Sequence, residues 1–135
     1  MRRIMSGRLK QFDVEVQNKV GALADLCELI SSNAINIQAI TTNGSGTVKI
    51  VTEDEETTRE ALKKAKLLFG ENDVMSLKLL DRPGELAKIT RVLANQKINI
   101  NSVYILGKNP ERKETEIAIQ VSDVMAATKA LSQLS

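Results

Sequence analysis

An internal repeat is the feature that most constrains the fold of this chain of 135 residues. The stretch 21–37 recurs 63 residues later as the stretch 84–100, without a gap. Six of its seventeen positions are identical, and three more exchange apolar residues of similar volume, which core packing tolerates. The chain is therefore predicted to contain two copies of one unit, at residues 1–72 and 73–135. Units of about 65 residues bury little surface, so we expect the two to share an interface that stabilises both.

The spacing of apolar residues predicts that each copy has the element order strand, helix, strand, strand, helix (βαββα). Phe12, Val14 and Val16 alternate with polar residues, which indicates a strand with one wet face. Apolar residues then recur at helical spacing from Leu23 to Ile30, which indicates a helix with one buried stripe. The other expected elements are strands at 35–42, 47–52, 74–80, 98–106 and 114–121, a helix entered near Gly84, and two closing helices with apolar stripes from Ala61 to Leu68 and from Ala127 to Leu134, N-capped by Asp54 and Asp123.

Two such units predict an α+β fold of the ferredoxin-like type, with an antiparallel sheet and helices on one face. A complete unit of that type has a fourth strand, and both units are predicted to lack it. Our hypothesis is that the two first strands, residues 11–17 and 74–80, pair with each other and form one continuous sheet across both units. The second hairpin carries about six extra residues near 107–112, either as a tolerated insertion or as a lid over a nearby site.

The composition argues against several classes of function. The sequence has no histidine, which removes the commonest general base and the commonest metal ligand. We therefore expect no catalytic residue, no metal and no cofactor, and predict that the chain is not an enzyme. Two Phe, one Tyr and a net charge of +2 leave little with which to bind nucleic acid. With a single cysteine, Cys27, and no long apolar segment or signal peptide, the chain is predicted to be cytoplasmic and to have no membrane partner.

The loop between the first strand and the first helix of each copy is the expected ligand site. A helix N-terminus offers unpaired N–H groups to a carboxylate, and a glycine there lets a ligand approach the backbone. A polar side chain three residues earlier can accept from an ammonium group, and an asparagine at the second strand can donate and accept. These groups suit a zwitterion, and an amino acid is the smallest ligand that matches them; alternatively, they only build turns and caps. The two sets are Asn18, Gly21 and Asn36, and Asp81, Gly84 and Asn99.

The same residues resemble the signature of ACT domains, which are small regulatory modules that bind amino acids. Residues 81–86 read Asp-Arg-Pro-Gly-Glu-Leu and residues 98–100 read Ile-Asn-Ile; the first copy is similar, with Val20 in place of the usual proline. In that family the ligand commonly lies between paired domains. The resemblance implies one site from Asn18, Val20, Gly21 and Asn99 and another from Asp81, Pro83, Gly84 and Asn36, with Ala22 and Glu85 as further ligand-binding candidates.

The sequence thus leads us to expect a non-enzymatic regulatory protein. It would bind a small amino acid at the interface between its two units and transmit this to a partner enzyme or to its own assembly. No catalytic domain accompanies the two units, so the partner, an enzyme of amino-acid metabolism, would be a separate chain. Exposed sheet edges favour a homodimer. The alternative is a regulatory or structural subunit that docks on a metabolic enzyme and binds no ligand itself.

Overall fold

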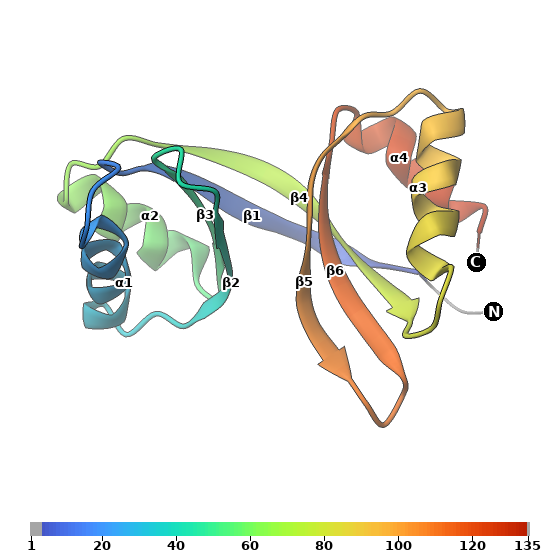
Figure 1. Ribbon diagram of the computed structural model, residues 1–135, viewed down its shortest axis with the longest axis horizontal. Coiled ribbons are helices and arrows are strands. Elements are labelled where there is room, and N and C mark those ends of the chain that lie inside the picture. Colours follow the sequence, from blue (N-terminus) through green and yellow to red (C-terminus); the bar gives the residue numbers. More distant parts are fainter. Residues whose placement is uncertain (1–3, 135) are drawn as a thin grey trace. The chain divides into compact units, whose positions relative to one another are not determined.

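The computed structural model describes residues 4–134, and they form the predicted α+β fold (Figure 1). The elements are β1 (Met5–Glu15), α1 (Ala22–Ser32), β2 (Ile37–Thr42), β3 (Thr47–Thr52), α2 (Glu55–Lys64), β4 (Phe69–Leu80), α3 (Glu85–Asn95), β5 (Ile100–Asn109), β6 (Glu114–Val121) and α4 (Val124–Ser132). The strands are hydrogen-bonded in the order β2-β3-β1-β4-β6-β5. The element order βαββα, predicted for each copy, is confirmed.

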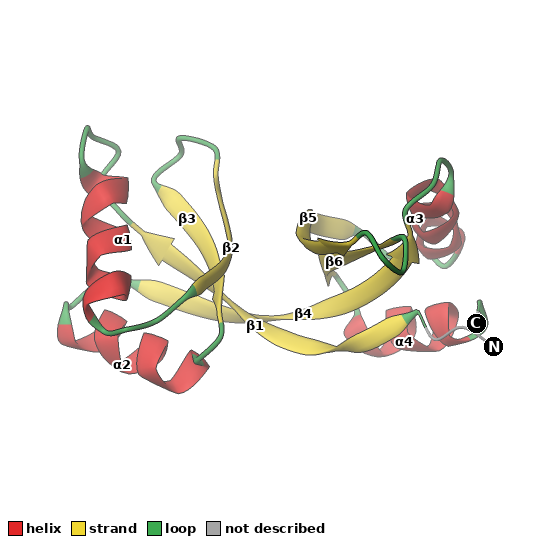
Figure 2. Cartoon of the chain, turned by 90° about the horizontal axis from the view of Figure 1, so that it is seen from below, coloured by secondary structure: helices red, strands yellow, loops and turns green. Residues whose placement is uncertain are grey.

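The described residues divide into two compact units, which we call the N-terminal unit (residues 10–72) and the C-terminal unit (residues 4–9 with 73–134). In each unit the two helices cover one face of the strands, as Figure 2 shows for α1 and α2 beside β2 and β3. None of the helices in this described part is long and apolar enough to span a bilayer.

Alternation along the strands builds the core of the N-terminal unit. Phe12 and Val14 of β1 face Ile50 and Val48 of β3 in antiparallel register, and all four are fully or almost fully buried. Leu26 and Ile30 of α1 and Leu62 of α2 pack against them. Each such buried aliphatic side chain contributes roughly 1.5–3 kcal/mol relative to exposure. The C-terminal unit repeats this core with Met75, Leu77, Ile89, Leu93, Ile117, Ile119 and Leu131.

The prediction that both units lack a fourth strand is wrong, because β1 and β4 are longer than their apolar patterns. Residues 69–72, the start of β4, belong to the N-terminal unit, where the N–H of Glu15 donates to the carbonyl of Leu68 (2.9 Å). The start of β1 belongs to the C-terminal unit, where the N–H of Lys78 donates to the carbonyl of Ile4 (2.7 Å). The strands β1 and β4 are neighbours, as predicted. These two hydrogen bonds, however, join residues 15 and 78 to residues 68 and 4, which lie outside the predicted first strands at 11–17 and 74–80.

The helix boundaries agree with the predicted caps at the closing helices. The carboxylate of Asp54 accepts from the N–H of Thr57, and that of Asp123 accepts from the N–H of Ala126, both at 3.0 Å. The predicted stripe of the first closing helix extends too far, since α2 ends at Lys64 and Leu68 is 74% exposed. Its buried face consists of Thr58, Ala61 and Leu62.

Candidate ligand-binding site

A glycine in the left-handed region opens both α1 and α3. Gly21 has a φ of 92° and Gly84 has a φ of 89°. Each is the N-cap residue of its helix, and neither helix has a capping hydrogen bond from a side chain at this position. Only glycine adopts this conformation at low cost. The backbone conformation therefore explains why both copies have a glycine at this position. A Cβ at either position would meet no atom within 4 Å, so the surroundings of both glycines are open.

Within one unit, the structure does not bring the repeated asparagine to the loop. On β3, Glu15 at the end of β1 faces Thr47, whereas Ile37 at the start of β2 faces Thr52, at the opposite end of the strand. At about 3.4 Å per residue, these positions are about 17 Å apart. Asn36 therefore lies far from Asn18, and its amide reaches Glu53 at 3.5 Å.

Asn99 in the C-terminal unit has the same place but another partner. Its amide donates to Asn101 at 3.0 Å, and its backbone pairs with Ser122. The backbone contacts of the two asparagines thus correspond, while their side-chain contacts differ. The combination of a loop with the asparagine of the other copy stays a prediction.

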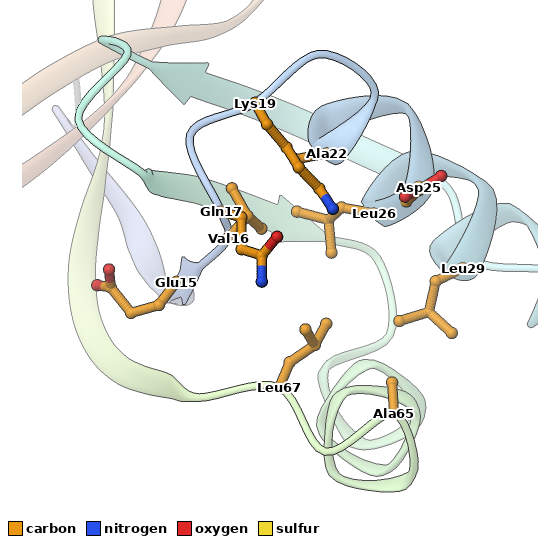
Figure 3. Close-up of a pocket in the computed structure, with 10 residues that line it drawn as sticks. All are labelled: Glu15, Val16, Gln17, Lys19, Ala22, Asp25, Leu26, Leu29, Ala65 and Leu67. Atoms are coloured by element: carbon orange, nitrogen blue, oxygen red, sulfur yellow. The ribbon is translucent and has the colours of Figure 1, made fainter.

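A cavity of about 450 Å³ lies in the N-terminal unit, beside the loop that leads to α1 (Figure 3). Its walls come from the end of β1, the first turns of α1 and the segment that follows α2. Leu29 and Leu67 point into the space between these elements. Among the residues predicted from sequence, Ala22 lines this cavity, and Asn18, Val20 and Gly21 do not.

Two opposite charges lie at the start of α1 beside this cavity. Lys19 extends over Ala22 toward Leu26, and Asp25 follows one turn along the helix (Figure 3). Neither side chain makes a hydrogen bond or an ion pair with any residue between 4 and 134. The cavity therefore offers a cation, an anion and an apolar wall to a small molecule.

The C-terminal unit has a smaller cavity of about 250 Å³ next to its own loop, lined in part by Glu85. The Glu85 side chain is only 11% exposed, and its carboxylate lies 3.4 Å from the Lys88 ammonium and 3.5 Å from the Arg82 guanidinium. Burial raises the pKa of Glu85, but the hydrogen bonds and charges of Lys88 and Arg82 outweigh it and hold the pKa below its usual range. Glu85 is therefore a paired anion inside the wall of the cavity.

The other candidates in the loop of this unit are exposed. Asp81 is half-exposed and forms an ion pair of 3.7 Å with Lys108 of the longer β5–β6 hairpin. Asp81 and Glu85 also line a third cavity of about 190 Å³, while Pro83 and Gly84 are exposed and line neither cavity of this unit's loop. One of the extra residues of the hairpin, Lys108, thus contacts the loop, and a lid over a nearby site stays a prediction.

Four of the residues that line the larger cavity were not among the candidates from sequence: Lys19, Asp25, Leu29 and Leu67. Leucines are typical of a core and single charges of a solvated surface, so neither residue type indicates a site by itself. A signal was present in the repeat, where Ala22 corresponds to Glu85 and Asp25 to Lys88, so that the charges change together. No group of three or more His, Cys, Asp or Glu that could hold a metal ion occurs among the described residues.

Several solved structures share this fold. Protein BT0572 from Bacteroides thetaiotaomicron is 23% identical, with a TM-score of 0.81 over 93% of this chain and 88% of that one. The ligand-free regulatory subunit of aspartate kinase from Thermus thermophilus is 17% identical, with a TM-score of 0.61 over 97% of both chains. Aspartokinase III from E. coli, in complex with lysine and aspartate, is 14% identical, with a TM-score of 0.59; this chain spans 31% of its length.

No curated protein matches the sequence. The family model described as an ACT domain pair does match it, over residues 7–110, which is most of the chain. This match agrees with the two βαββα units and with the two glycine-capped loops. The chain belongs to the ACT domain pair family.

Proposed function

We propose that this ACT domain pair is a regulatory protein that binds a small amino acid and transmits binding to an enzyme of amino-acid metabolism, or to its own assembly. The observation that carries the proposal is the cavity beside the first loop, where Lys19 and Asp25 lie close to an apolar wall. A zwitterion has one group for each of these charges. The regulatory subunits of aspartate kinase from two Thermus species have this fold over nearly their whole length, which supports a regulatory role by analogy.

Regulation requires that the ligand binds two states of the protein unequally. Self-assembly is one candidate for such a change, because β2 and β5 are the edge strands of the sheet. On β5, Val103 and Ile105 are 43% and 56% exposed, and an exposed edge can pair with another chain. The proposal therefore includes a homodimer, and assigns no chemical reaction to the chain.

A thermal-shift screen with each of the twenty amino acids tests the proposal. A ligand at a hundred times its Kd adds about 2.7 kcal/mol to the free energy of unfolding, so at least one amino acid should raise the Tm by several degrees, and the rise should grow with its concentration. Native mass measurement of the same samples reports assembly. A Tm that responds to none of the twenty, together with capture of a folded enzyme by the purified chain, would favour the docking subunit without a ligand.

A further inference from the structure

The two cavities beside the helix-opening loops occupy equivalent places in the two units. Six wall residues of the smaller cavity, at positions 79, 80, 82, 85, 88 and 89, have counterparts 63 residues earlier in the wall of the larger one. Val16 corresponds to Leu79 and Leu26 to Ile89. Outside the aligned positions, Leu67 contributes to the wall of the larger cavity and Ile4 to that of the smaller one. The cavities are therefore two versions of one feature.

The two versions differ in their charges. Lys19 corresponds to Arg82, so both keep a cation at the loop. The next turn differs, since Ala22 stands where Glu85 stands, and Asp25 stands where Lys88 stands. In the C-terminal unit the three side chains form a compact group of two ion pairs. In the N-terminal unit Ala22 brings no carboxylate into the cavity, Lys19 extends over it, and the cavity is larger, about 450 against about 250 Å³.

We propose that the N-terminal cavity is the ligand site of the chain, and that Glu85 fills the equivalent place in the C-terminal unit from within. Each chain then binds one molecule of an α-amino acid with an apolar side chain. This inference rests on the proposed function. It places the ligand inside one unit, between β1, α1 and the segment after α2.

The residues of the C-terminal unit indicate how the ligand is held. There, a carboxylate lies between the cations of Arg82 and Lys88. In the N-terminal unit, Lys19 is the cation left to receive a ligand carboxylate, and Asp25 is the anion for its ammonium group. Charge-assisted hydrogen bonds of this kind are the stronger ones in proteins. The apolar side chain of the ligand contacts Leu29 and Leu67.

Transfer of the internal anion tests the assignment. The double variant Ala22→Glu/Asp25→Lys gives the N-terminal unit the charges of the C-terminal unit, and should abolish binding of L-leucine, L-methionine and L-phenylalanine in calorimetry. Its Tm without ligand should be unchanged or higher, because the new ion pairs form with Lys19. The matched control is Ala24→Glu, which adds a carboxylate to the exposed side of the same helix and should bind as the wild type does.

The reverse exchange tests the role of Glu85. Glu85→Ala/Lys88→Asp gives the C-terminal unit the charges of the N-terminal one, and should raise the stoichiometry from one to two ligands per chain. With the wild type, 4-methylpentanoic acid and isopentylamine, which each lack one charged group of leucine, should bind at least about tenfold more weakly than leucine.

The outcomes separate the two proposals. A wild type that binds one amino acid per chain, lost in Ala22→Glu/Asp25→Lys and kept in Ala24→Glu, supports the cavity. A folded Ala22→Glu/Asp25→Lys variant that still binds like the wild type, or a wild type that binds two ligands per chain, overturns the cavity and leaves the proposed function standing. A wild type that binds none of the twenty amino acids overturns both.

Discussion

The glycines at the start of α1 and α3 are the residues whose backbone geometry is most demanding. Other L-residues lose about 1–2 kcal/mol in the left-handed region, and the open space around both glycines adds no clash. We expect Gly21→Ala and Gly84→Ala each to lower the free energy of unfolding by about 1 kcal/mol or more in urea denaturation. Gly70→Ala is the control, because Gly70 lies in β4 outside that region and has open space too. Equal losses at all three positions would contradict this account.

Two residues with side chains occupy the left-handed region just after the same helices. Ala34 has a φ of 58° and Lys97 a φ of 59°, and each follows the C-cap residue. Glycine is the usual residue there, so we expect Ala34→Gly and Lys97→Gly to raise the free energy of unfolding by about 0.5–1 kcal/mol. Ala24→Gly, inside α1, should lower it by about 1 kcal/mol. Losses after both helices would show that the ends of α1 and α3 are not strained.

Lys19 and Asp81 distinguish the proposed ligand cavity from the loop of the C-terminal unit, which belongs to one of the two sites predicted by sequence. Asp81 carries a charge that Asn18 lacks, but it already pairs with Lys108. We expect Lys19→Ala to weaken amino-acid binding about tenfold or more, because the ligand carboxylate loses its cation. Asp81→Ala should bind like the wild type. Calorimetry of the two variants measures this, and the opposite ranking would restore the loop of the C-terminal unit as the site.

At the scale of elements, the cap of α2 makes stability depend on pH. The hydroxyl of Thr57 donates to Asp54 at 2.7 Å and its N–H donates at 3.0 Å, and these bonds hold the pKa of Asp54 below its ordinary value of 3.8. A lowered pKa in the folded state means that the carboxylate stabilises the fold above about pH 3.8, and that this is lost as pH falls through the folded pKa.

Asp54→Ala should therefore lower the Tm at pH 7, and the deficit should shrink below about pH 4, where the wild type loses its ionised cap. Thermal melts between pH 3 and pH 7 measure it. Glu60→Ala, which removes an exposed carboxylate from the same helix, controls for the change in net charge. A deficit that is constant across this range would show that the ionised form of Asp54 contributes nothing.

The sequence predicted the boundaries of those elements that their own side chains mark. The strands β3 and β6 begin and end where they were predicted to, since apolar residues mark both. The first halves of β1 and β4 were not predicted as strands because residues 6–8 and 71–73 are polar or glycine. These segments are strands because another strand pairs with their backbones, and a local pattern does not reveal such a partner. The cavity was not predicted either, because its walls come from three separate elements and no local pattern shows that they lie together.

At the scale of the whole molecule, the C-terminal unit depends on the other end of the chain. Ile4 is 7% exposed and packs in the core that contains Met75, Leu77 and Leu79. Its carbonyl accepts from Lys78 at 2.7 Å. The fourth strand of this unit is thus supplied by residues 4–9, which precede the predicted first strand at 11–17. A substitution near the N-terminus should consequently lower the stability of the C-terminal unit.

Ile4→Ala makes that consequence measurable. Removing a buried Ile side chain costs about 2–5 kcal/mol, depending on how far the site collapses. Native-state hydrogen exchange should show faster exchange for the amides of β4 after residue 73 and of β6, with a smaller change in β3. Val20→Ala, at a fully exposed position of the N-terminal unit, should change neither. If β3 lost as much protection as β6, the two units would unfold as one cooperative body, whereas no loss in β6 would mean that residues 4–9 do not complete its sheet.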